Sequence, residues 1–295
     1  MRLTVGTKSG LATVHGDGTI EWMLKGDVRV CDGRWAIVDG TNIASIDDAR
    51  IVVRTERSLQ CLASTGDDVL VGTAGAHLLR VTSLFQRWTP VDVDSFDRIP
   101  TRDDWYTPWG DPPDTRSITC VDDGVMLVNV HVGGVWRSSP VDDTWSEVIE
   151  VDNDTHQVLA ADAGETVVVA AAVGYGQSDD SGRTFAWTAD GLHATYCRAV
   201  AVADDVVLLS ASTGPFTQHG AVYLRPLDYD GAFVRCDNGL PEWFPGNVDS
   251  FQLAARGSVA AIGTDAGQLF VSEDGGSSWG LLVDGLDAVR SVSVS

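Results

Sequence analysis

The stretch SEDGGSSW (residues 272–279) decides the fold of this chain. It has the form S-x-D-x-G-x-S-W, and a second copy, SDDSGRTF, occupies residues 178–185. Eroded versions stand at 139–145 (SPVDDTW) and 15–22 (HGDGTIEW). An enzyme needs a catalytic loop once, whereas a turn recurs wherever the fold repeats a unit. We therefore interpret the stretch as a repeated turn and not as a catalytic or metal-binding loop.

The residue types of this motif suit a tight turn between two strands. Asp and Ser side chains accept backbone N–H bonds, Gly supplies a positive φ, and the closing aromatic packs between neighbouring units. The residues that we expect in these structural roles are Ser178, Asp180, Gly182 and Phe185 in one copy and Ser272, Asp274, Gly276 and Trp279 in the other.

Further repeats run along the whole chain. An apolar run followed by Gly-Thr and a turn occurs at 3–10, 69–76 and 260–267, and segments such as RSLQCLA (57–63) and RAVAVAD (198–204) recur. Their spacing of roughly 40 to 60 residues is near the period of a four-stranded propeller blade. The last such segment, RSVSVS (290–295), ends the chain, and the N-terminus begins without one. We therefore predict an all-β fold, a seven-bladed β-propeller of four-stranded antiparallel blades, closed by the C-terminal strand joining the N-terminal blade.

We expect a single domain over residues 1–295. The expected blades are 288–295 with 1–25, then 26–56, 57–93, 116–150, 156–191, 196–240 and 248–287, with an insertion at 94–115. The blade at 26–56 is short and has no closing aromatic.

The motif copies also carry a family resemblance. S-x-D-x-G-x-S-W resembles the Asp-box of BNR-repeat propellers, a group that includes sialidases, the sortilin ectodomain and photosystem II assembly propellers. The middle and C-terminal segments look like the prokaryotic WD40/YVTN/BNR-like repeat proteins, many of which are labelled glycosyl hydrolases by similarity. This resemblance implies a propeller and brings in glycoside hydrolysis as an activity to test.

The charge of the chain is strongly negative, with 42 acidic and 20 basic residues and a net charge of −22. The acids are 35 Asp and 7 Glu, and the bases are 18 Arg and 2 Lys. This bias resembles haloarchaeal proteins, whose Asp-rich surfaces stay hydrated in concentrated salt. We therefore expect a halophilic protein, and we exclude nucleic acid as a non-specific partner.

Other composition features narrow the class of protein. No apolar run approaches the length of a membrane span, and residues 1–10 lack a signal-peptide pattern, so we expect a cytoplasmic protein without a membrane partner. The five cysteines form no CxxC pair and the six histidines show no metal-ligand spacing. We therefore expect buried thiols, no metal site and no cofactor.

The recurring segments also point to a candidate site. In a propeller, the starts of the inner strands meet at one mouth of the central channel, on the face opposite to the S-x-D-x-G turns. The residues that we expect at this mouth are Arg57, Arg116, His156, Arg198 and Arg290, with Arg29 and Asp249 at the two remaining positions. Arginine holds carboxylate or phosphate in a bidentate fashion. Two interpretations stay open: an anion-binding site, or arginines neutralised by neighbouring aspartates.

Aromatic residues on the connecting loops extend this candidate site. Trp105 lies in the insertion and Trp243 lies in PEWFPGN (241–247). Aromatic faces suit sugar rings and the hot spots of a protein partner, although such residues also serve to cover a channel.

We predict a binding protein and not an enzyme, a monomer that recognises an anionic small molecule, glycan or protein segment. One alternative is a sialidase-like glycoside hydrolase acting on acidic sugars, with Asp249, Glu242 and Tyr196 as weak catalytic candidates. The other is a scaffold for protein assembly.

Overall fold

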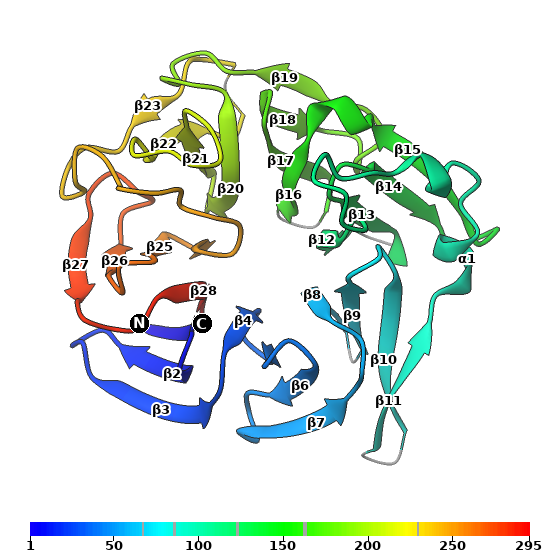
Figure 1. The fold of residues 1–295 in the computed structure, drawn as a ribbon. Coiled ribbons are helices and arrows are strands. Elements are labelled where there is room, and N and C mark those ends of the chain that lie inside the picture. Colours follow the sequence, from blue (N-terminus) through cyan, green and yellow to red (C-terminus); the bar gives the residue numbers. More distant parts are fainter. Residues whose placement is uncertain (67, 85–86, 122–123, 162–163, 229) are drawn as a thin grey trace.

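Short β-branched runs alternate with turns rich in Gly and Asp, so each run forms a strand that pairs with the next through a hairpin. The computed structural model describes residues 1–295 apart from 67, 85–86, 122–123, 162–163 and 229. The described residues form seven separate four-stranded antiparallel sheets. Figure 1 shows these sheets arranged as blades around a central axis. The predicted seven-bladed β-propeller is therefore confirmed.

The first blade is built from both ends of the chain. Its strands are β28 (Val289–Val294), β1 (Arg2–Thr7), β2 (Gly10–His15) and β3 (Ile20–Lys25), in that order from the axis outward. β28 pairs with β1 along Leu3 to Thr7, and the two termini lie side by side in Figure 1. The predicted closure of the ring by the C-terminal strand is confirmed.

Each remaining blade uses four consecutive strands. Blade two contains β4 (Val28–Cys31), β5 (Trp35–Val38), β6 (Asn42–Ser45) and β7 (Arg50–Arg54), and blade three contains β8 (Leu59–Thr65), β9 (Asp68–Thr73), β10 (Leu78–Leu84) and β11 (Arg87–Asp92). Blade four contains β12 (Thr115–Cys120), β13 (Met126–Val130), β14 (Gly134–Ser139) and β15 (Thr144–Ile149), and blade five contains β16 (Thr155–Ala161), β17 (Thr166–Ala171), β18 (Gly174–Ser178) and β19 (Ala186–Thr188). Blade six contains β20 (Tyr196–Ala203), β21 (Val206–Ser212), β22 (Ala221–Pro226) and β23 (Val234–Arg235), and blade seven contains β24 (Leu253–Arg256), β25 (Val259–Gly263), β26 (Leu269–Ser272) and β27 (Gly280–Val283).

The hydrophobic core is divided among the contacts between neighbouring blades. Seven clusters of buried residues each draw members from two adjacent blades. The short helices α1 (Asp94–Asp97) and η1 (Arg102–Asp104) lie in the insertion between blades three and four, and η3 (Val151–Asn153) precedes β16. All five cysteines are free thiols. Among the described residues, no helix has the length and apolar character required to cross a membrane.

The two S-x-D-x-G turns connect the third and fourth strands of blades five and seven. In blade seven, the buried hydroxyl of Ser272 donates to Asp274 Oδ1 (2.8 Å) and accepts from the backbone N–H of Gly276 (2.8 Å). Asp274 in turn accepts from the N–H and the hydroxyl of Ser278 at 2.8 and 2.6 Å. Gly276 has a φ of 90°, and an added Cβ would lie 2.4 Å from Leu208 of blade six. The side chains of Ser272, Asp274 and Ser278 are all hydrogen-bonded inside the turn, as a structural role requires.

The second turn repeats these contacts almost atom for atom. Ser178 donates to Asp180 Oδ1 at 2.7 Å and accepts from the N–H of Gly182 at 2.9 Å. Asp180 also accepts from the N–H and hydroxyl of Thr184 at 2.9 and 2.7 Å. The closing aromatics Phe185 and Trp279 pack in the clusters between blades four and five and between blades six and seven.

Candidate functional site

A β-bulge near the start of the inner strand recurs in six of the seven blades. The pairing with the second strand skips one residue of the inner strand in five of these blades, and in blade six it skips Arg198 and Ala199. The residues at these bulges are Arg29, Gln60, Arg116, His156, Arg198 and Arg290. A bulge re-aims a side chain and ends regular pairing. The bulge therefore gives each of these six blades a residue that departs from the regular pairing at the start of the inner strand.

Five of these six residues line a cavity of about 470 Å³. Its arginines are Arg29, Arg116, Arg198 and Arg290, and its aspartates are Asp27, Asp114, Asp249 and Asp265. Gln60, Trp109, His131 and residues 250–252 complete most of the remaining wall. The cavity is thus a polar chamber with equal numbers of arginines and aspartates.

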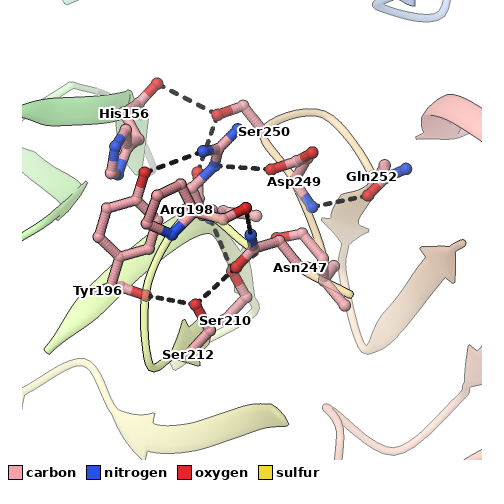
Figure 2. A network of polar contacts seen from close by, with 12 residues as sticks. His156, Tyr196, Arg198, Ser210, Ser212, Asn247, Asp249, Ser250 and Gln252 are labelled. Carbon is pink, nitrogen blue, oxygen red and sulfur yellow. Dashed lines mark hydrogen bonds and ion pairs between the residues drawn. The ribbon is translucent and has the colours of Figure 1, made fainter. Parts of the chain in front are cut away.

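Residues 249–252, which we term the floor segment, close the bottom of this cavity. The Ser250 hydroxyl donates to the carbonyl oxygens of His156 (3.2 Å) and Arg198 (2.9 Å), as Figure 2 shows. The carbonyl of Phe251 accepts from Val292 N (2.8 Å) in β28, and the Phe251 side chain packs against the clusters of blades two to four. The floor segment therefore crosses the axis and bonds to blades on several sides of it.

Phe251 lies between this chamber and a second cavity farther along the channel. The second cavity, of about 310 Å³, is lined mainly by apolar residues of β16, β20 and β24, and Phe251 belongs to the walls of both. Phe251 has a φ of 70°, a conformation that few residues with a side chain adopt. The bonds of Ser250 and of the Phe251 carbonyl hold this conformation in place.

Arg198 is held firmly at the cavity wall. Its Nε lies 2.6 Å from Asp249 Oδ1, and its terminal nitrogen donates to the Tyr196 hydroxyl at 3.1 Å (Figure 2). Asp249 is in turn oriented by Gln252, whose side-chain oxygen accepts from the Asp249 N–H at 2.7 Å. One charge of the chamber is therefore already neutralised by a neighbouring aspartate.

Arg116 differs from Arg198 in forming no ion pair with any described residue. It lines the cavity but makes no ion pair and no side-chain hydrogen bond with any residue that the structure describes. Burial, together with the positive charge of Arg198, lowers the pKa of Arg116 to about 10. The guanidinium remains charged at neutral pH, so it is a half-buried cation in the wall of the cavity.

Behind Arg116 lies a group of one carboxylate and two histidines. The carboxylate of Asp154 is 3.8 Å from His131 Nε2 and 3.6 Å from His156 Nε2. Burial and the nearby Arg116 lower the pKa of His131 to about 3, and burial also lowers the pKa of His156. Both rings are therefore neutral at physiological pH, and Asp154 keeps its negative charge near Arg116.

Several residues predicted at the mouth lie elsewhere. Arg57 precedes β8 and forms an ion pair with Asp92 (2.5 Å) outside the cavity, because the bulge of blade three falls on Gln60 instead. His156 occupies a bulge, but its ring is fully buried and contacts the carbonyl oxygen of Cys197 (2.6 Å). These two positions of the predicted mouth are corrected by the structure, whereas Arg116, Arg198 and Arg290 do line the cavity.

The predicted tryptophans also take other positions. Trp105 is buried in the core between blades three and four, 5.6 Å from the ring of Trp136. Trp243 lies outside the wall of the cavity, and the guanidinium of Arg235 stacks over its ring at 4.0 Å. The tryptophan that does line the cavity is Trp109, from the same insertion as Trp105.

The three catalytic candidates, Tyr196, Glu242 and Asp249, do not form a common site. Tyr196 contacts Arg198 and the ring of His156, and no carboxylate among the described residues lies in hydrogen-bond contact with its hydroxyl. Glu242 is exposed and lies outside the cavity wall, while Asp249 is engaged by Arg198. Within the described part of the chain, no group of three or more His, Cys, Asp or Glu side chains is arranged to hold a metal ion.

Comparison with solved structures identifies the fold. No protein-family model matches the chain, and no curated protein matches it. The WD40-repeat structure of RRP9 aligns with a TM-score of 0.65 at 14% identity, covering 91% of this chain and 84% of that one. A candidate 6-phosphogluconolactonase from Bacteroides uniformis aligns with a TM-score of 0.67 at 13% identity, covering 99% and 98% of the two chains. A chain of a nidogen/laminin complex aligns with a TM-score of 0.61 at 7% identity, covering 99% and 97%. At these identities the similarity establishes a seven-bladed β-propeller with WD40-repeat neighbours.

Proposed function

We propose that the protein binds a small molecule through an anionic group, with a carboxylate as the best fit, in the cavity between Arg116 and Arg198. The observation that carries this proposal is the guanidinium of Arg116, which lines the cavity and forms no ion pair and no side-chain hydrogen bond with any described residue. A carboxylate beside it would supply the bidentate partner that this half-buried guanidinium lacks within the described part of the protein.

The choice of arginine supports a carboxylate as the binding group. Guanidinium offers a planar pair of donors that matches the two oxygens of a carboxylate, whereas an ammonium acts as a point charge. Arg198 forms an ion pair through Nε with Asp249 and donates through a terminal nitrogen to Tyr196, so these contacts keep its plane fixed. A fixed plane lowers the entropic cost of ordering the arginine when a ligand binds.

The contacts of Tyr196 favour binding over hydrolysis. A glycosidase that uses a tyrosine nucleophile requires a neighbouring carboxylate to take the phenolic proton. Here the Tyr196 hydroxyl accepts a bond from Arg198, and the nearest partners that the structure records for it are Arg198 and His156. We therefore propose a binding protein without hydrolytic activity.

The surface composition supports a proposed working environment of concentrated salt. At about 1 M salt the Debye length falls to about 3 Å, so weak surface ion pairs are screened. Multidentate contacts inside an enclosed cavity are screened much less than exposed ones. The burial of Arg116 is consistent with recognition under such conditions.

Titration calorimetry with 3-hydroxybutyrate, gluconate, N-acetylneuraminate and inorganic phosphate tests this function. We expect at least one carboxylate to bind, and Arg116→Gln to weaken it by about 1.5 to 3 kcal/mol, the usual value of a hydrogen bond to a charged group. Arg57→Gln is the matched control, because it removes the same charge from an arginine outside the cavity. Binding that is equal in both variants, or no binding of any of these four probes or of the carboxylate zwitterions tested below, would overturn the proposal.

A further inference from the structure

The cavity carries balanced charges and not a uniformly positive wall. Four arginines and four aspartates line it, so their formal charges cancel. His131 adds no charge, because burial and the nearby Arg116 hold its ring neutral at physiological pH. A ligand that is purely anionic would satisfy the arginines and leave the carboxylates of the same chamber facing a like charge.

Asp114 is the carboxylate best placed to meet a positive group. It stands two residues before the bulged Arg116, and its backbone is fixed by a bridge to Ala74 and by the bond from His131 N to its carbonyl oxygen (2.8 Å). Its side chain forms no ion pair with any described residue. Burial raises the pKa of Asp114, while Arg29 and Arg116 act in the opposite direction. A cation beside this carboxylate would therefore be stabilising.

Trp109 contributes an aromatic ring to the wall of the same chamber. Its side chain is 59% exposed although it belongs to the cavity wall, and its ring centroid lies 5.1 Å from that of His131. A turn closed by the bond from Gly110 N to Thr107 O (2.9 Å) holds the segment that carries it. The electron-rich face of an indole attracts ammonium groups, quaternary ones included.

These three features come from one side of the cavity. Trp109 and Asp114 lie in the segment that leads into β12, Arg116 lies at its bulge, and His131 follows β13 of the same blade. The wall of one cavity therefore contains a carboxylate and an aromatic ring that suit a cation, and two arginines, Arg116 and Arg198, that suit an anion.

We infer that the ligand is a small zwitterion, with its carboxylate on Arg116 and Arg198 and its positively charged nitrogen between Asp114 and the face of Trp109. This inference rests on the proposed function, because it takes the carboxylate position from it. It adds that Asp114 takes part in selecting the ligand and does more than offset the charge of the arginines.

Three related probes distinguish the anion-binding residues from the cation-binding residues. Carnitine carries a carboxylate and a trimethylammonium group, 3-hydroxybutyrate has the same four-carbon chain without the ammonium, and choline keeps the hydroxyl and the trimethylammonium group but lacks the carboxymethyl group. We expect calorimetry to show carnitine binding roughly tenfold more tightly than 3-hydroxybutyrate, the size of one cation–π and carboxylate contact in an enclosed site. Choline should bind more weakly than carnitine by a similar or larger factor. Tighter binding of 4-amino-3-hydroxybutyrate than of carnitine would support the same class with a primary ammonium.

Variants then locate the cation. Asp114→Asn and Trp109→Leu should each lower the ratio of carnitine affinity to 3-hydroxybutyrate affinity. Asp111→Asn is the matched control, because Asp111 is exposed and outside the cavity wall, three residues away from Asp114. The ranking of the three probes on the unmodified protein needs no variant, so the test stands even if a substitution impairs folding.

The outcomes distinguish the two proposals. If 3-hydroxybutyrate binds as tightly as carnitine and Arg116→Gln weakens both, the zwitterion inference fails and the proposed function stands. If choline binds as tightly as carnitine, the carboxylate position on Arg116 and Arg198 is overturned. If none of these probes binds, and gluconate, N-acetylneuraminate and phosphate do not bind either, both proposals fail.

Discussion

Replacing Ser272 by alanine should destabilise the protein more than neutralising the acidic residue beside it. The Ser272 hydroxyl is buried and is the recorded partner of the backbone N–H of Gly276 at 2.8 Å. Removing it leaves this buried N–H without an acceptor, at a cost of about 1 to 3 kcal/mol. The bond from Ser272 to Asp274 Oδ1 (2.8 Å) is lost as well.

The exposed Asp274 should matter less. Asp274→Asn keeps an acceptor oxygen for the Ser278 N–H, and water reaches whatever the change leaves unpaired. We expect a loss below about 1 kcal/mol, because a bond at the surface exchanges readily with a bond to water. The buried hydroxyl, and not the carboxylate that gives the motif its catalytic look, is the main stabilising group of this turn.

Thermal unfolding in a fixed salt concentration measures both variants. A loss of 1 kcal/mol lowers the Tm of a large domain by about 2 to 4 °C, so a loss of about 2 kcal/mol, the middle of the range for Ser272→Ala, should lower it by roughly 4 to 8 °C. Ser178→Ala, which loses the equivalent bond to Gly182, should match it, and Ser277→Ala, at an exposed serine of the same turn, should leave the Tm unchanged. The reasoning is refuted if Asp274→Asn lowers the Tm as much as Ser272→Ala does.

Three further predictions concern the site and the charge of the protein. Ser210→Ala should lower the free energy of unfolding, measured by chemical denaturation, by about 2 to 4 kcal/mol. The Ser210 hydroxyl accepts from Ala199 N and donates to Val248 O, both at 2.8 Å, and the substitution would leave both backbone groups buried without a partner. A loss below about 1 kcal/mol would contradict this prediction. Folding lowers the pKa of His131 from 6.5 to about 3. The unfolded chain therefore binds this proton more readily than the folded protein, and the free energy of unfolding falls as the pH drops from 6.5 toward about 3, by at most about 1.4 kcal/mol per pH unit. His131→Gln should therefore flatten the fall in unfolding free energy between pH 6.5 and pH 5.5, and an unchanged slope would contradict the lowered pKa. Raising KCl from about 0.1 M to about 1 M should raise the Tm, because salt screens the self-repulsion that follows from the net charge of −22; a fall in Tm would argue against the halophilic interpretation.

The fold could be predicted because its signals are periodic. The number of blades follows from the repeated turns and from the spacing of the apolar runs. The closure of the ring follows from the segment at 290–295, which has no further strands after it. The seven sheets confirm both predictions. Each of these signals depends on the local chemistry of strands and turns, which the sequence carries directly.

The site could be predicted only in part because bulges are not visible in a sequence. RSLQCLA and RSITCVD share their first two letters, which placed Arg57 beside Arg116, but pairing with the next strand puts the bulge of blade three on Gln60. A one-residue shift in pairing turns a side chain to the other face of a strand, so similar letters need not point the same way.

Other wall residues come from segments without a repeat pattern. Trp109 lies in the insertion, and Phe251 reaches across the channel with a positive φ that its residue type does not suggest. One usable signal was present, since Asp27 and Asp114 each stand two residues before a bulged arginine. This Asp-x-Arg pattern would have predicted a chamber with both charges instead of an arginine ring.

The account is tested most directly by a crystal structure of the protein soaked with carnitine. We predict density for a carboxylate within hydrogen-bond distance of both Arg116 and Arg198, with the trimethylammonium group near Asp114 and Trp109. Density at another place, or an Arg116 side chain turned away to pair with a neighbouring aspartate while the cavity stays empty, would contradict the central claim that Arg116 awaits an anionic ligand.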